Sequence, residues 1–430
     1  MPRRSSGMSS GAIFTLTESK INAMRYSLLV ISTLICLFTQ LGNVCAQDYG
    51  LENNMPTFYA ELKQQLTFPW SWQAKKGEMS FDAWRKAARE EIFKTMQLAP
   101  PAPDSFAYEV VEREQRDGYE AQKIRFNINK WERITAYLLV PSVTPAPAVL
   151  MLHDHGAHFA IGKEKMVRPF GVDSVITADA QQWVEACYDG RYVGDEFARR
   201  GYVVLSFDAL FWGDRSRKED RIDGSGATSG KKIADALSTK ERKQKTYDAQ
   251  QALASNLLQM GTSWGAWITW DDMRAAAFLA QLPVVDKRKV ACLGFSMGAY
   301  RSWMLAALSD DIKASAAVCW INDTEHLMSL SNNQNKGGSA YSMLIPGIRN
   351  LMDYPHVASL ICPKPALFFN GDRDKLFPVP GVEASYGVMR EVWHSQGKDD
   401  RLVTKIWPEK HFLNRAMQEE IADFFDKAMR

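Results

Sequence analysis

Residues 289–308 read Lys-Val-Ala-Cys-Leu-Gly-Phe-Ser-Met-Gly-Ala-Tyr-Arg-Ser-Trp-Met-Leu-Ala-Ala-Leu. Apolar residues fill positions 290–293, and apolar residues at helical spacing follow Gly298. This order predicts a strand, a sharp turn and a helix. Such a turn strains the backbone of its central residue, Ser296, and brings neighbouring backbone close to the positions two residues away. Gly294 and Gly298 occupy these two positions, as the turn requires.

The predicted turn holds the Ser296 hydroxyl above the edge of a sheet. The amide of Met297 and the N-terminus of the helix then point at any oxyanion that forms on a bound substrate. This is the geometry of a hydrolase nucleophile elbow. Because Gly-x-Ser-x-Gly also arises by chance, the interpretation depends on the flanking strand and helix and on the acid and histidine that follow.

The composition is typical of a globular enzyme rather than of a charged binding module. Of the 430 residues, 46% are hydrophobic and 24% are charged, and the net charge is +2. This hydrophobic content suffices for a large core, and α/β enzymes often exceed roughly 250 residues in one domain. A balanced charge favours small or neutral partners over nucleic acid. We expect no nucleic-acid partner and no cofactor, and the oligomeric state stays open.

The N-terminus has the pattern of a targeting segment, and we assign residues 1–46 to a signal peptide. Lys20 and Arg25 precede an apolar stretch at residues 28–38, and small residues end the segment at Ala46. The apolar stretch is shorter than the ~20 residues of a membrane-spanning helix. We therefore expect no membrane span, and export to the periplasm or the medium.

Two features leave alternatives open in this segment. Met24 makes a more usual start than Met1, which would leave residues 1–23 outside the translated protein. Cys45 offers a site for a lipid anchor, although Val44 is bulkier than a lipidation signal usually tolerates there.

Four cysteines lie beyond the predicted signal peptide: Cys187, Cys292, Cys319 and Cys362. Cys292 and Cys319 fall in apolar runs, where free cysteine behaves as a small hydrophobic residue. No pair has the Cys-x-x-Cys spacing of a metal site. We therefore expect neither a disulfide framework nor a cysteine zinc site.

The chain order predicts an N-terminal helical extension at residues 47–103 and a catalytic domain at residues 104–430. Residues 56–98 have the pattern of two amphipathic helices, the second over residues 81–96, and a proline-rich stretch ends them. Residues 107–141 alternate between apolar and polar side chains, as antiparallel strands do.

From Ala148 onward, short apolar strands alternate with helices, which predicts a doubly wound α/β fold with a mostly parallel sheet covered on both faces. We expect strands at residues 148–152, 203–207, 290–293, 314–319, 366–369 and 402–406, and helices at residues 272–282 and 414–429. Two insertions, at residues 159–200 and 214–262, interrupt this alternation. Insertions after strands of such a sheet lie where ligands bind, so we expect them to be lids or substrate walls.

A nucleophilic serine needs a base and a carboxylate that orients the base, and in this fold the acid and then the histidine follow the serine. His394 and His411 both lie beyond the candidate acids. His394 falls in an amphipathic helical run, whereas His411 follows a predicted strand, so we predict His411 as the base. Of two aspartates after the preceding strand, we predict Asp374 as the acid, because it lies three residues after a glycine. Asp372 is the alternative, although it also suits the turn itself.

The sequence His153-Asp154-His155-Gly156-Ala157-His158 follows another predicted strand. The fold takes its second oxyanion donor from this loop, and we assign that donor to the amide of Gly156 or Ala157. A zinc site built on the three histidines is the alternative. Such a site would need further ligands from later strand ends, which the sequence does not offer, so we expect no metal.

Several motifs together resemble one group of enzymes. They are Gly201-Tyr202-Val203-Val204, Gly213-Asp214-Arg215, Asp271-Asp272-Met273-Arg274-Ala275, the Ser296 turn, Ile345-Pro346-Gly347, Asn370-Gly371-Asp372-Arg373-Asp374 and His411. Over residues 100–430 the chain is similar to secreted bacterial α/β-hydrolases of the acetyl xylan esterase-like or dienelactone hydrolase-like group. That group overlaps a carbohydrate-esterase family with pectin methylesterase activity. The resemblance implies the α/β-hydrolase fold, with Ser296 as nucleophile, Asp374 as acid and His411 as base, and leaves Asp372 open as the acid.

Candidates for substrate binding lie in or near the insertions. Trp264 and Trp267 are placed to stack on sugar rings, and Lys163, Arg168 and Arg215 to hold the carboxylate of a uronic acid. The ordinary interpretations of such residues are a packed indole and a solvated charge.

Export and the resemblance favour an ester on a plant polysaccharide or oligosaccharide as substrate, with acetyl ahead of the methyl ester of a uronate. The alternatives are a pectin or uronate methylesterase, a serine peptidase of the same fold, a metal-dependent hydrolase using the His153–His158 cluster, and a non-catalytic glycan-binding relative. The last of these is expected to lack a triad residue.

Overall fold

The structure, a computed structural model, describes residues 51–52, 55–56, 58–217, 239–329 and 338–429. The predicted signal peptide and the glycine-rich part of the second predicted insertion lie outside these ranges. The chain divides into two units, Met1–Ala60 and Glu61–Arg430. In the first unit, two short strands, β1 (Leu51–Glu52) and β2 (Met55–Pro56), pair antiparallel.

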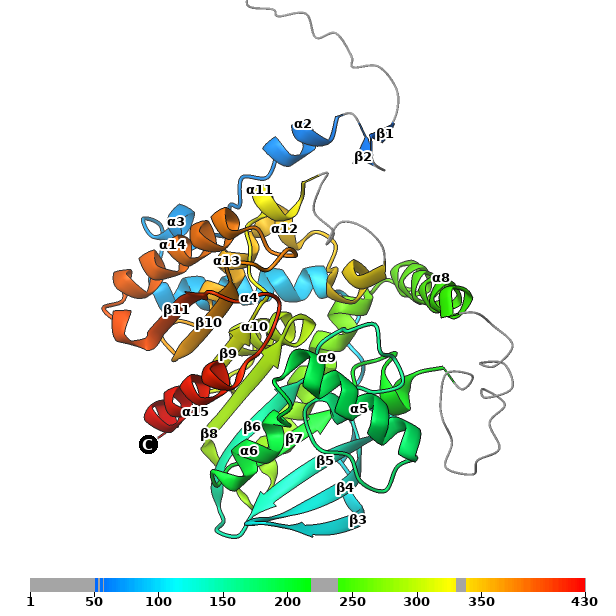
Figure 1. Ribbon diagram of the computed structural model, residues 1–430. Coiled ribbons are helices and arrows are strands. Elements are labelled where there is room, and N and C mark those ends of the chain that lie inside the picture. The colour runs from blue at the N-terminus through cyan, green and yellow to red at the C-terminus, as the bar shows by residue number, and fades with distance from the viewer. Residues whose placement is uncertain (1–50, 53–54, 57, 218–238, 330–337, 430) are drawn as a thin grey trace, which may run out of the picture. The chain divides into compact units, whose positions relative to one another are not determined.

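The second unit is built on a nine-stranded mixed sheet with the order β11-β10-β9-β8-β6-β7-β5-β4-β3 (Figure 1). Six strands are parallel: β6 (Ala146–Leu152), β7 (Val203–Phe207), β8 (Val285–Phe295), β9 (Ala314–Val318), β10 (Ala366–Gly371) and β11 (Leu402–Trp407). Three N-terminal strands continue the sheet antiparallel: β3 (Glu109–Arg116), β4 (Tyr119–Asn127) and β5 (Arg133–Pro141). The predicted mostly parallel sheet with antiparallel N-terminal strands is confirmed.

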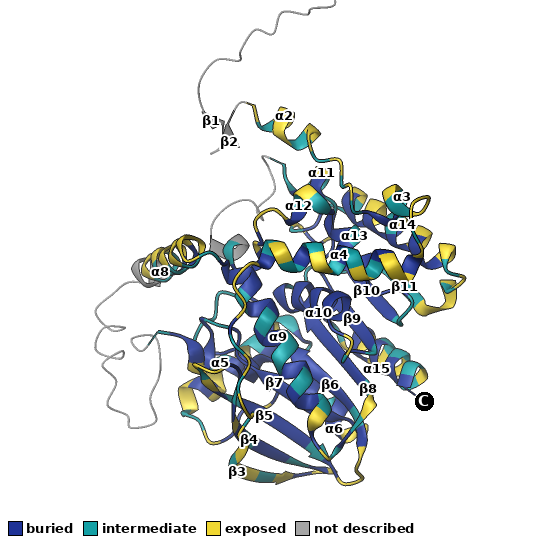
Figure 2. Ribbon diagram, turned by 180° about the vertical axis from the view of Figure 1, so that it is seen from behind, coloured by how far each residue is buried: buried dark blue, intermediate teal, exposed yellow. Residues whose placement is uncertain are grey.

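Helices cover both faces of this sheet, and the central strands are buried (Figure 2). One core contains side chains of α4 (Phe81–Met96), α9 (Trp264–Gln281), α10 (Met297–Leu308) and α14 (Val379–Ser395). The other core contains side chains of α5 (Ser174–Cys187), α6 (Val193–Arg199) and α15 (Arg415–Met429). The strands alternate core-facing residues between these two clusters, as a sheet covered on both faces requires.

Further helices complete the fold. They are α2 (Tyr59–Gln64), α3 (Trp72–Lys75), α8 (Thr239–Gln259), α11 (Thr324–Leu327), α12 (Ile348–Leu351), α13 (Tyr354–Ser359) and the 3-10 turns Lys163–Lys165, Gly213–Arg215, Gly338–Met343 and Asp399–Arg401. In the part of the chain that the structure describes, no helix is both long enough and apolar enough to cross a bilayer.

Helix α4 packs onto the sheet domain within the second unit. α4 begins after Ser80, whose hydroxyl accepts a hydrogen bond from the Ala83 amide and so caps the helix. Arg89 of this helix donates to the carbonyl of Ala307 at the end of α10. The helix predicted at residues 81–96 is therefore confirmed, while the single helix expected before it is two short ones, α2 and α3.

The first predicted insertion, residues 159–200, is in part an ordinary crossover. Its second helix, α6, contacts β5 and β7 directly, and Phe197 of α6 is buried in the core of that face. Residues 193–199 therefore cover the sheet as the helix of a β–α–β unit does. They are not the lid that we expected for this whole stretch.

Candidate active site

Ser296 lies between the end of β8 and the start of α10. Its backbone angles, φ 55° and ψ −123°, are strained for a residue with a side chain. Its amide donates to the Val318 carbonyl at 2.8 Å, which fixes the turn to the neighbouring strand β9. A Cβ atom on Gly294 would lie 1.9 Å from the carbonyl oxygen of Gly298, so the turn closes only around a glycine.

Gly298 ties the turn to the end of β6. A Cβ atom there would lie 1.9 Å from the carbonyl oxygen of Leu152. The loop that follows Leu152 therefore starts directly beside the Ser296 turn, which is where the second oxyanion donor was predicted.

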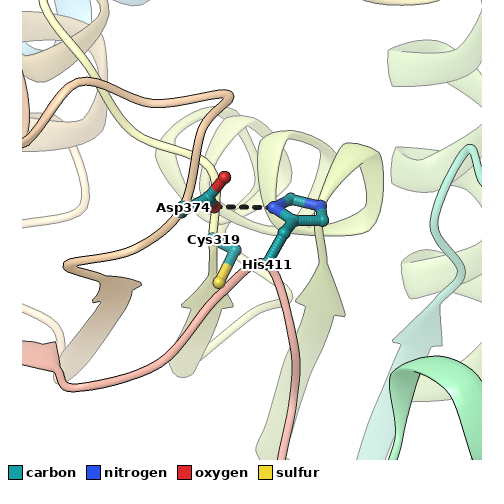
Figure 3. Close-up of side chains that lie close together, drawn as sticks. All are labelled: Cys319, Asp374 and His411. Carbon is teal, nitrogen blue, oxygen red and sulfur yellow. Dashed lines mark hydrogen bonds and ion pairs between the residues drawn. The ribbon is translucent and has the colours of Figure 1, made fainter.

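His411 and Asp374 come to Ser296 from the ends of two other strands. The Nε2 atom of His411 lies 2.9 Å from the Oγ atom of Ser296, and its Nδ1 atom lies 2.6 Å from Asp374 Oδ2. Asp374 follows β10, and its Oδ1 atom accepts the Leu376 amide at 2.9 Å. Figure 3 shows the Asp374 carboxylate directed at the imidazole. Gly371 permits this approach, because a Cβ atom there would lie 2.1 Å from the Glu409 carbonyl oxygen.

The hydrogen bonds indicate where the protons lie in the series Ser296–His411–Asp374. A carboxylate only accepts, so Nδ1 of His411 carries the proton that is donated to Asp374. Nε2 is then free to accept the proton of the Ser296 hydroxyl, as a general base does. The Asp374 side chain is fully buried and 23% of the His411 side chain is exposed, so the acid is shielded while the base faces outward.

The alternative acid and base lie elsewhere. The side chain of Asp372 is 48% exposed and pairs with Arg373. His394 lies on α14, is 80% exposed, and pairs with Asp399 at 3.0 Å. Of the two aspartates, the structure brings Asp374 to His411.

Cys319 is a neighbour of this group that the sequence analysis did not assign to the site. It follows β9 with φ 60°, and its amide donates to the Phe369 carbonyl at 2.7 Å. Its Sγ atom lies within 4.8 Å of a carboxylate oxygen of Asp374 and of a ring nitrogen of His411 (Figure 3). Burial raises the pKa of the thiol well above its ordinary value, so it is an uncharged packing group below the triad. Its place at the end of a predicted strand, residues 314–319, was the available signal.

The histidines of the loop after β6 form hydrogen bonds within the protein. Nδ1 of His153 lies 2.8 Å from the Asp154 carbonyl, and its Nε2 accepts the Ala209 amide at 3.0 Å. His158 pairs with Asp179 at 2.7 Å. Both ring nitrogens of His153 and Nδ1 of His158 are thus paired within the protein, and among the described residues no candidate metal-ligand group includes a histidine of this loop.

The two predicted amide donors in this loop differ. The Ala157 amide already donates to Nδ1 of His155 at 3.3 Å. Gly156 has φ 56°, and a Cβ atom there would lie 2.5 Å from the Trp183 ring. Burial lowers the pKa of His155 to about 3, so its imidazole is neutral and remains an acceptor for Ala157. Of the two predicted donors, we therefore favour the Gly156 amide.

Three of the predicted substrate-binding residues are buried and paired inside the protein. Lys163 contacts Asp208 at 2.7 Å, and its side chain is 2% exposed. Arg215 contacts Asp271 at 2.8 Å and is 4% exposed. Trp264 is 1% exposed. Their charges and rings are used within the fold, so the prediction that they bind substrate is wrong.

The other two predicted substrate-binding residues, Arg168 and Trp267, are more exposed and lie in different parts of the fold. The side chain of Arg168 is 50% exposed and pairs with Glu114 of β3 at 2.7 Å. β3 lies five strand positions from β8, about 24 Å at the usual spacing. Arg168 is therefore wrongly placed to hold a group bound at Ser296. Trp267 is half-buried and stacks on Trp131.

Comparisons with known proteins agree with this fold. Residues 222–397 match the sequence model of a family described as Abhydrolase family. The Bacillus subtilis (strain 168) protein YtaP, which carries a provisional description as a hydrolase, is 25% identical over 346 residues, which are 80% of this chain and 99% of that protein.

Solved structures show the same architecture. A Bacteroides fragilis NCTC 9343 protein provisionally described as an acetyl xylan esterase matches with a TM-score of 0.61 and 18% identity, over 85% of this chain and 84% of that one. A glucuronoyl esterase from Solibacter usitatus matches with a TM-score of 0.54 and 13% identity, over 90% of this chain and 99% of that one. The chain therefore has the α/β-hydrolase fold.

Proposed function

We propose that this chain is a serine ester hydrolase that removes acetyl groups from plant cell-wall polysaccharides or their oligosaccharides. The observation that carries the proposal is the hydrogen-bonded chain from Ser296 through His411 to Asp374, with distances of 2.9 Å and 2.6 Å. Its nucleophile lies on a strained turn at the N-terminus of α10, where an oxyanion is stabilised. We also propose that the protein is exported.

The proposed reaction has two halves. Ser296 attacks the ester carbonyl while His411 accepts the Ser296 proton, and the amides of Met297 and Gly156 stabilise the oxyanion. His411 then protonates the departing sugar hydroxyl, which leaves an acyl group on Ser296. Water, deprotonated by His411, attacks this acyl group and releases acetate. Asp374 holds the imidazole in the tautomer that both halves require.

The methyl ester of a uronate is the second candidate substrate, and the fold shared with a glucuronoyl esterase favours it. Two of the three cations that we expected to hold a uronate carboxylate, Lys163 and Arg215, are buried in internal ion pairs. This loss of support leaves acetyl as the favoured acyl group that is transferred to Ser296. A serine peptidase and a non-catalytic glycan-binding protein remain the candidates from other classes.

The deciding experiment assays acetate from acetylated xylan and methanol from methyl-esterified pectin, with wild-type protein and Ser296→Ala. Loss of a nucleophilic serine costs on the order of 10⁶ in turnover. Ser302→Ala is a matched control on the same helix, because its hydroxyl faces Ala316 and Cys292 instead of His411. We expect acetate release that Ser296→Ala abolishes and Ser302→Ala retains.

Other outcomes identify the alternatives. Methanol without acetate would make the protein a uronate methylesterase. Retention of most activity in Ser296→Ala would overturn the nucleophile assignment. Cleavage of a peptide substrate with neither product would favour the peptidase, and oligosaccharide binding without any turnover would favour the non-catalytic protein.

A further inference from the structure

An exposed tryptophan forms the tip of the hairpin between β4 and β5. Trp131 is 64% exposed, although an indole of this size is usually covered. Its ring stacks on Trp267 of α9, with ring centroids 6.2 Å apart and an angle of 17° between the planes. Its amide donates to Asn129 Oδ1 at 2.9 Å. The outer indole is therefore held by a second ring and by the turn beneath it.

The strand register places this tip at the edge of the sheet that carries Ser296. β6, β7 and β8 are parallel, so their carboxyl ends share one edge. β5 runs antiparallel to β7, and Ala136 pairs with Phe207, the last residue of β7. Residues 128–132 precede β5 and therefore lie at that same edge. Glu132 confirms this position, because it pairs at 2.6 Å with Arg215 in the segment after β7.

Beside the exposed ring lies a hollow of about 340 Å³ with polar walls. Its lining includes Ser105, Asn129, Lys130, Trp131 and Glu132. Asn129 is only 1% exposed, and its Nδ2 atom has no hydrogen-bond partner. A buried amide donor without a partner is costly, and native proteins usually satisfy it. The hollow thus combines a flat apolar ring with polar and charged side chains, and one of its lining residues, Asn129, keeps a buried donor without a protein partner.

A pyranose ring has the matching chemistry. One face of the ring carries C–H groups that pack on an indole, and its edge carries hydroxyl groups that pair with amides and charged side chains. We propose that Trp131, supported by Trp267, is a stacking platform for a sugar unit of the glycan chain, outside the position of the reacting ester. The choice of a glycan rests on the proposed function, but binding at the platform does not require turnover.

The test measures oligosaccharide affinity without any ester present. Xylohexaose and hexagalacturonate are titrated into wild-type protein, Trp131→Ala and Trp131→Phe, with calorimetric detection. A stacked ring contributes enough that its loss weakens binding about fivefold. We expect this loss for Trp131→Ala and retention of most affinity for Trp131→Phe, for whichever of the two oligosaccharides binds. Val143→Ala is the control, because Val143 is 80% exposed and lies beyond the opposite end of β5.

The outcomes separate this platform from the catalytic assignment. Unchanged affinity in Trp131→Ala, equal losses in Val143→Ala, or binding of neither oligosaccharide to wild-type protein would overturn the platform. With acetylated xylan, we also expect Trp131→Ala to raise KM about fivefold with little change in kcat, and to leave hydrolysis of a small aryl acetate unchanged. If Ser296→Ala keeps its activity while Trp131→Ala loses affinity, the proposed catalysis fails and the platform stands.

Discussion

A buried ion pair joins α9 to α10, the helix that begins after Ser296. Removing its carboxylate tests how much this pair stabilises the fold around the candidate active site. Asp272 of α9 accepts two hydrogen bonds from Arg301 of α10, at 2.6 Å and 3.0 Å, and both side chains are 1% exposed. The Nη1 atom of Arg301 already lacks a partner. Asp272→Asn therefore leaves a buried guanidinium without a counter-charge, which costs about 3–5 kcal/mol.

The assay is urea unfolding of the purified protein, followed by tryptophan fluorescence at pH 7.5. Glu196→Gln is the control, because Glu196 pairs with Arg199 at 2.7 Å with both side chains partly exposed, and such a pair contributes at most about 1 kcal/mol. The double variant Asp272→Leu/Arg301→Met replaces the ion pair with apolar groups and is expected to recover most of the lost stability. A loss below about 1 kcal/mol in Asp272→Asn, or no recovery in the double variant, would refute this reasoning.

Three further predictions concern single residues of the site. Asp374→Asn should lower kcat by about 10⁴ because the imidazole loses its tautomer, whereas Asp372→Asn should change kcat little, and steady-state kinetics on an aryl acetate separates them. Gly298→Ala should lower the free energy of unfolding by about 1–3 kcal/mol and reduce turnover, because the added Cβ atom would lie 1.9 Å from the Leu152 carbonyl oxygen. The control is Gly387→Ala on α14, where the added Cβ atom meets open space and should leave the stability unchanged or higher. Urea titration measures both. His155 has a pKa lowered to about 3 in the folded protein, so the unfolded chain binds the proton first as pH falls below about 6.5. Stability should thus fall between pH 7.5 and pH 5, and because burial also lowers the pKa of His153, His155→Asn should lose about 2 kcal/mol less than the wild-type protein over this range rather than losing nothing.

Local sequence patterns were sufficient to predict the sheet and the relative order of the candidate site residues. The apolar runs gave the parallel strands, and β7 has the predicted bounds. Because parallel strands end at one edge, a serine, an aspartate and a histidine placed directly after such runs were bound to meet there. The structure brings Ser296, Asp374 and His411 together for this reason.

The buried charges could not be predicted in the same way. Lys163 and Arg215 lie in stretches that read as solvated, and their partners Asp208 and Asp271 are 45 and 56 residues further along the chain. Local sequence does not say which distant carboxylate will neutralise a charge, and without that partner a buried lysine or arginine is improbable. The stacked pair of Trp131 and Trp267 could not be predicted for the same reason, because the two residues are more than a hundred positions apart in the chain.

The antiparallel hairpin formed by β4 and β5 is a different stretch of chain from the segments that carry Ser296, Asp374 and His411. Its tip reaches the edge that bears Ser296, yet neither strand supplies a residue to the hydrogen-bonded chain from Ser296 to Asp374. An insertion or deletion of two residues at residues 128–132 would keep the strand faces in register, because side chains alternate with a period of two. Such a change would raise or lower the exposed indole above the edge and leave the reacting groups in place. On the proposed function, a change in hairpin length alone would alter glycan binding at Trp131 and leave the hydrogen-bonded chain from Ser296 to Asp374 in place.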